Sequence, residues 1–171
     1  MNNELKLAVE TFISKASESG QTGKAIDKNE CIQLNEKLNL IIPEWYQELI
    51  TTYPLSGIEF MWQAFEPKED FDGLSTIWWA DADNIYSETS ETMPGAKLLK
   101  EGYFCVACDN DGIGDPYFIN STDGENSTVY QVSHELLAES ELIISGFTAA
   151  IVGKKLSEVF DNAIFKITKN T

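Results

Sequence analysis

The chain contains no arginine and only one histidine, so every other basic residue among its 171 is a lysine. The planar guanidinium of arginine is the usual two-point ligand of phosphate groups, and its absence argues against phosphate or nucleic-acid recognition. The sequence also lacks a glycine-rich phosphate loop and a dinucleotide-binding fingerprint. We therefore expect neither a nucleic-acid partner nor a nucleotide cofactor.

Long apolar runs and paired cysteines are scarce as well. No apolar run approaches the roughly 18 residues needed to cross a bilayer, so we expect no membrane span. The first residues lack the separate regions of a signal peptide, and the chain has three cysteines, which together favour a reducing cytoplasm. Cys105 and Cys108 have redox spacing, but they fall in an expected strand, where residues three apart face opposite sides. We expect structural thiols and no metal.

What the chain has in excess is negative charge. It carries 28 acidic residues against 12 lysines, and eighteen of those acids, with only three lysines, lie in residues 59–153. Such a field repels nucleic acid and anionic membranes and attracts basic proteins. Solubility alone is the competing explanation for this charge.

The length and apolar content predict one domain over residues 1–171, with an N-terminal helix and linker in residues 1–27 and a core in residues 28–165. Apolar residues repeat every three or four positions in several segments, which is typical of amphipathic helices. The expected helices are Asn3–Ser17, a segment from Asp27 or Asn29 to about Leu38, Pro43–Tyr53, Ala82–Ser90 and Lys154–Phe165.

Short β-branched and aromatic runs separated by Gly, Asn and Asp clusters predict strands joined by turns. The expected strands are Ile58–Phe65, Ser75–Trp79, Tyr103–Asp109, Asp115–Asn120 and Thr128–Val132, with a further strand within Glu141–Val152. The predicted fold class is α+β, with a mainly antiparallel sheet of five to six strands. We expect helices near both ends of the chain to cover one face of this sheet.

Several short motifs follow one another along the chain, namely Phe104–Ala107, Gly114-Asp115-Pro116-Tyr117, Val129-Tyr130 and His134-Glu135. In this order they resemble the SUKH superfamily of Smi/Knr-like domains. Shorter similarities lie at Leu38–Tyr46, Tyr53–Gly57, Ile77–Trp79 and Leu156–Phe160, so the resemblance covers roughly residues 30–165. It implies Gly114, Asp115 and Tyr117 as a structural signature. It also implies a bacterial toxin-immunity protein or a regulator similar to those of fungal cell-wall synthesis.

Three acidic loops are the candidate partner surface, namely Glu66–Asp72, Asp109–Asp115 and Asp123–Glu125. The partner-binding candidates are Glu66, Glu69, Asp70, Asp72, Asp109, Asp111, Asp115, Asp123 and Glu125. Because adjacent strand residues face opposite ways, one of Trp78 and Trp79 belongs to the core and the other can be exposed. We assign Trp79 to the partner surface, as an aromatic anchor beside the acids.

Catalytic alternatives have weaker support. Asp109–Asp115 fails as a calcium loop because Ile113 and Asn120 stand where ligands are needed, so we expect a polar turn. The single histidine, His134, can be paired with Cys105 or Cys108, but no motif supplies an oxyanion hole. The preferred function is a non-enzymatic protein that neutralises a basic toxin, most simply a nuclease. A regulatory scaffold and a carboxylate-dependent enzyme are the alternatives, and the oligomeric state is left open.

Overall fold

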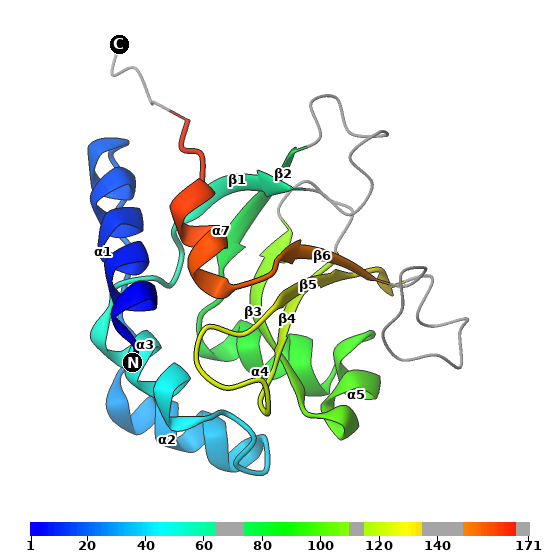
Figure 1. Ribbon diagram of the computed structural model, residues 1–171. Helices are drawn as coiled ribbons and strands as arrows, with labels where there is room; N and C mark the ends of the chain where they lie inside the picture. The colour runs from blue at the N-terminus through cyan, green and yellow to red at the C-terminus, as the bar shows by residue number, and fades with distance from the viewer. Residues whose placement is uncertain (64–73, 110–114, 135–148, 167–171) are drawn as a thin grey trace.

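The computed structural model describes residues 1–63, 74–109, 115–134 and 149–166 (Figure 1). Its helices are α1 (Asn3–Glu18), α2 (Lys28–Lys37), α3 (Glu44–Thr52), α4 (Ala82–Ser90), α5 (Gly95–Leu98) and α7 (Leu156–Asn162), with a 3-10 turn η1 (Leu99–Glu101). Its strands are β1 (Glu59–Gln63), β2 (Leu74–Trp79), β3 (Tyr103–Asp109), β4 (Tyr117–Asn120), β5 (Val129–Val132) and β6 (Ala149–Gly153). The predicted α+β class is confirmed.

The strands form one six-stranded sheet in the order β1-β2-β3-β4-β5-β6, and each neighbouring pair is antiparallel. Phe104 pairs with Ile119 and Cys105 with Phe118, as expected for a meander. The sheet curls enough for its edge strands to touch, because Trp62 Nε1 on β1 donates a hydrogen bond to the Val152 carbonyl on β6 at 2.6 Å. The predicted antiparallel sheet of five to six strands is therefore confirmed.

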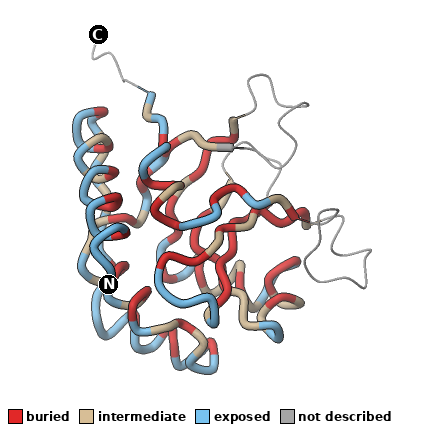
Figure 2. Tube along the Cα trace, in the orientation of Figure 1, coloured by how far each residue is buried: buried red, intermediate tan, exposed pale blue. Residues whose placement is uncertain are grey.

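The main core lies between one face of the sheet and the helices near the two ends of the chain, as predicted. Phe12 of α1 is central to it, with ring centroids 5.1 Å from Phe60 of β1 and 5.0 Å from Phe160 of α7. Tyr46 of α3 packs on Phe104 of β3 at 5.0 Å. Figure 2 shows the resulting pattern, in which α1 and α2 bury one side and expose the other.

A smaller cluster occupies the opposite face of the sheet. Leu98 of α5 packs there with Cys105, Phe118, Val132 and Ala149. The short helix α5 and the turn η1 were not predicted, because a segment of seven residues is too short to show a helical period. The two faces are therefore covered unequally by the part of the chain that the structure describes.

One turn of the backbone holds two non-glycine residues in the left-handed region. After α2, Asn39 has φ 56° and Leu40 has φ 63°, and the Leu40 side chain is 69% exposed. The left-handed conformation costs an L-residue about 1–2 kcal/mol, whereas glycine adopts it freely but loses about 0.5–1 kcal/mol more entropy on folding. Leu40→Gly is therefore expected to raise the free energy of unfolding by about 0.5–1 kcal/mol in urea denaturation.

The matched control is Leu7→Gly, because Leu7 is equally exposed but lies inside α1. Glycine within a helix costs about 1 kcal/mol, so this variant is expected to be less stable than the wild type. A loss of stability in Leu40→Gly would contradict the assignment of backbone strain at this turn.

Candidate functional site

The carboxylate of Asp115 holds together two segments that are far apart in the sequence. Its Oδ1 accepts a hydrogen bond from the backbone N–H of His134 at 2.9 Å and lies 2.8 Å from His134 Nδ1. The Asp115 side chain is only 8% exposed, whereas that of His134 is 40% exposed. Asp115 thus fixes the segment just before β4 against the segment just after β5.

This position corrects one site assignment. Asp115 is too buried to contact a partner, and its carboxylate is already used within the fold. Tyr117 is buried in the main core, whereas Gly114 lies outside the described residues. The strand begins at Tyr117 rather than at Asp115, since Pro116 has no N–H to donate to a ladder.

Cys105 is a poor nucleophile. Burial raises the pKa of the Cys105 thiol well above its usual value, and a hydrogen bond with Cys108 raises it further. A thiol that stays protonated reacts slowly, so the geometry does not favour a Cys105–His134 catalytic pair. Among the described residues, no group of three or more potential ligand side chains could hold a metal ion.

The two thiols of the Cys105–Cys108 pair lie near the same cluster, which contradicts the expectation that they face opposite sides. Cys105 belongs to the smaller cluster, Cys108 packs against both clusters, and a hydrogen bond joins the two thiols. The cause is a β-bulge in β3, where the register with β4 shifts between Cys105 and Ala107. An extra residue at a bulge interrupts the alternation of faces. Both cysteines are free thiols.

The turn Ser121–Ser127 presents the described members of the third acidic loop. Asp123 and Glu125 are exposed there, between β4 and β5. Asn120 anchors the start of the turn, because its Nδ2 donates to the Glu101 carbonyl at 2.9 Å and its Oδ1 accepts from the Thr122 N–H at 2.9 Å. The carboxylates of Asp123 and Glu125 therefore lie on a turn whose backbone is held by hydrogen bonds.

The end of the same turn is anchored on α7. Asn126 Oδ1 accepts the backbone N–H of Ser157 at 2.6 Å, and Asn126 Nδ2 donates to Ser157 Oγ at 2.9 Å. Asn126 has φ 65° and is buried, which suits a residue whose side chain replaces missing backbone partners. Glu125 Oε1 also lies 3.4 Å from the amino group of Met1.

Trp79 is the second site assignment that the structure corrects. Its side chain is 1% exposed and packs on Phe60 and Phe160, so it is a core residue. Trp78 points to the other face, opposite Glu59 and Cys108, and is partly exposed. The alternation was right, but the assignment of the two tryptophans to core and surface was inverted.

The first acidic loop and most of the second lie outside the described residues, and with them Glu66, Glu69, Asp70, Asp72 and Asp111. Asp109 ends β3 and is partly buried, opposite Ile77. Of the nine expected acidic contacts, the structure thus shows Asp123 and Glu125 as exposed groups.

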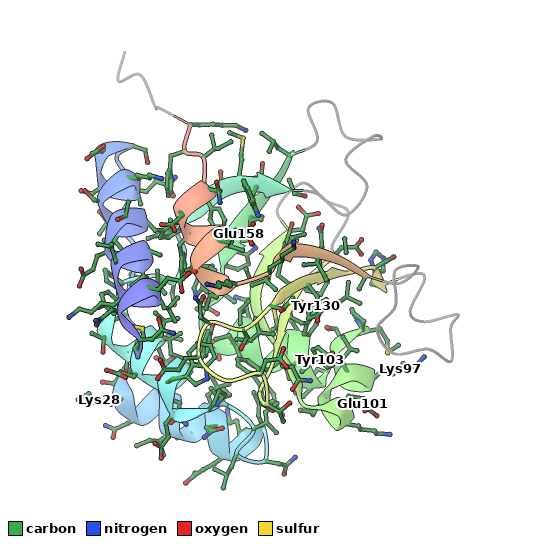
Figure 3. All side chains as sticks on the ribbon, in the orientation of Figure 1. Lys28, Lys97, Glu101, Tyr103, Tyr130 and Glu158 are labelled. Atoms are coloured by element: carbon green, nitrogen blue, oxygen red, sulfur yellow. The ribbon has the colours of Figure 1, made fainter. Side chains whose placement is uncertain are left out.

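An aromatic pair that sequence reasoning missed lies beside this turn. The rings of Tyr103 on β3 and Tyr130 on β5 meet edge to face, 5.9 Å apart, and Figure 3 shows them together with Glu101. Both tyrosines are half-buried. The period of two in the predicted strands could have placed Tyr130 on one face with Val132, but the neighbouring Tyr103 depends on the register across β4.

An open hollow of about 390 Å³ lies between α1 and the segment after α7, lined by Lys15, Glu18, Ser19, Ala163 and Phe165. Lys15 Nζ is already engaged, because it donates to the Asp161 carbonyl at 2.7 Å. The Ser19 hydroxyl likewise donates to the Ala16 carbonyl at 2.7 Å, so both groups bond to the backbone.

Comparisons with protein-family models, with curated proteins and with solved structures found no match to this chain. Within the described residues, no helix has both the length and the apolar character required to cross a bilayer.

Proposed function

We propose that this chain is a SUKH-type protein-binding module of the cytoplasm that neutralises a basic toxin domain, most simply a nuclease. The observation that carries the proposal is the concentration of charge in residues 59–153, with eighteen acids and three lysines. Repulsion among like charges costs stability, so a selected basic partner explains why so many are kept. Two observations agree with that family. The sequence motifs occur in the family's order, and an antiparallel sheet has one face covered by helices from both ends of the chain.

Several exposed acids of this segment are not neutralised by a described residue. Glu91, Glu101 and Asp123 are exposed and form no ion pair within the described part of the chain, whereas Glu125 lies 3.4 Å from the amino group of Met1. These carboxylates can therefore attract a positively charged partner, and salt weakens this attraction.

The anchored turn supports binding rather than solubility alone. A carboxylate used only for solubility needs no fixed position, whereas Asp123 and Glu125 stand on a turn held at both ends by buried asparagines. Preorganised contacts lose less entropy on binding. A nuclease must present a basic groove to its substrate, so an acidic protein can occupy the same groove and compete with nucleic acid.

The test is association kinetics with the C-terminal toxin domain encoded by the neighbouring gene, captured on a surface at two ionic strengths. The double reversal Glu101→Lys with Asp123→Lys is expected to slow association about 10-fold at low salt, because steering by charge acts mainly on the association rate. The wild-type rate is expected to fall steeply as salt rises.

The matched control is Glu18→Lys with Glu36→Lys, which changes the net charge equally but on exposed positions of α1 and α2. It is expected to slow association much less. Equal slowing by both pairs, or a rate independent of salt, would show that the acids of residues 59–153 do not form the binding surface. Binding without any loss of toxin activity would favour a regulatory scaffold.

A further inference from the structure

Four residues form a row across the second face of the sheet, running from β3 to the edge strand β6. Cys105 is paired with Phe118, Phe118 with Tyr130, and Tyr130 with Ile151. Directly opposed residues of antiparallel strands share a face, so the four side chains project on the same side. Cys105 and Phe118 are 0% exposed, Tyr130 is half-buried and Ile151 is 56% exposed.

Burial decreases along this row with distance from its β3 end, which helices cover. The α4 residue Thr89 accepts a hydrogen bond from the Cys105 N–H at 2.9 Å, and Leu98 of α5 belongs to the same cluster. Tyr130 packs against the margin of this cluster, whereas Ile151 belongs to neither core cluster among the described residues. The end of the row at β5 and β6 is therefore an apolar and aromatic surface.

Two carboxylates lie beside the tyrosine pair of this surface. The pKa of Tyr103 is raised by its partial burial, then by the neighbouring Tyr130, and also by the negative charges of Asp123 and Glu101. These two carboxylates therefore lie close enough to act on the tyrosine pair. Neither forms an ion pair with a described residue.

We propose that Tyr103, Tyr130 and Ile151 form the anchor on which a basic protein partner docks, with Asp123 and Glu101 binding its cationic side chains at the rim. The proposal rests on the proposed function and names the surface that serves it. Tyrosines are enriched at binding hot spots, and the face of a tyrosine ring also attracts the guanidinium or ammonium group of a partner.

The charge of the molecule selects the occupant. A second copy of this chain would bring a net charge of −16 against another −16, and would set Asp123 and Glu101 against acids. A basic surface instead gains from the same groups. The apolar row slows dissociation of the bound partner. The carboxylates attract the basic partner and so raise the association rate.

The experiment measures dissociation of the neighbouring-gene toxin domain from the wild type and from Tyr130→Thr with Ile151→Thr. Threonine keeps the strand preference of both positions. The double variant is expected to dissociate at least 10-fold faster, while its association rate changes by less than about 3-fold. The control pair is Leu7→Thr with Ile32→Thr, since both residues are exposed apolar groups on the helices α1 and α2. The control is expected to dissociate like the wild type.

Urea denaturation checks that the variants fold. If Tyr130→Thr destabilises the sheet, the single variant Ile151→Thr replaces the double variant in the kinetic measurement, because Ile151 is exposed. Unchanged dissociation in the folded variants would overturn the proposed anchor and leave the proposed function standing. No binding of the toxin domain by the wild type would overturn the proposed function, and the anchor with it. Concentration-dependent self-association that the double variant loses would assign this surface to a second copy and also overturn the proposal.

Discussion

Replacement of Trp79 by alanine is expected to lower the free energy of unfolding by about 3–5 kcal/mol. Trp79 is 1% exposed, and its ring lies 4.9 Å from that of Phe160 and 6.4 Å from that of Phe60. The substitution removes the largest fully buried side chain of the core and leaves a cavity between the sheet and α7. Urea denaturation followed by circular dichroism measures the change.

The adjacent Trp78 provides the control, because it lies on the same strand and faces the other way. Trp78→Ala is expected to cost less than half as much, since that side chain is already partly exposed. Similar losses in the two variants would contradict the burial difference between them. A stable Trp79→Ala protein that no longer binds the toxin domain would return Trp79 to the partner surface.

The two tryptophans show where strand periodicity stops being informative. The alternation of faces required Trp78 and Trp79 to point in opposite directions, and they do. Which direction is the core depends on where α1 and α7 pack, and those helices are distant in sequence from β2. Nothing in the residues around the pair specifies that contact.

Local signals were more informative than distant ones. Asp27, one of the two expected caps of the second helix, accepts the Asn29 N–H at 2.8 Å and stands directly before α2. A cap of this kind depends on neighbouring residues only, so it can be predicted from sequence. The β-bulge in β3 depends on pairing with β4, and the orientation of the Cys105 and Cys108 thiols was accordingly predicted wrongly.

The candidate surface also has features that local sequence predicts and features that depend on distant contacts. The acidic character of residues 59–153 is a property of composition, and the exposure of Asp123 and Glu125 follows from their place in a polar turn. The Tyr103–Tyr130 pair is a property of three-strand register, because the rings meet across β4. Asp115 was predicted both as part of a structural signature and as a partner contact, and its burial and its hydrogen bond from the His134 N–H fit the structural role.

Asp115→Ala is expected to lower the free energy of unfolding by about 2–3 kcal/mol, because it leaves the His134 N–H and imidazole without their buried charged acceptor. Asp115→Asn is expected to cost about 1 kcal/mol, since the amide oxygen still accepts the N–H but the negative charge is lost. Urea denaturation of both variants measures the two changes in the free energy of unfolding.

The matched control for Asp115 is Asp83→Ala, because Asp83 is an exposed aspartate in the first turn of α4. It is expected to change stability by less than about 1 kcal/mol, the scale of a favourable charge near a helix N-terminus. If Asp115→Ala were as stable as this control, and had lost only toxin binding, Asp115 would be a contact residue. A large loss of stability with unchanged binding by the folded fraction would instead show that the family-like signature holds β4 against the end of β5, and that recognition lies on the neighbouring Asp123 turn.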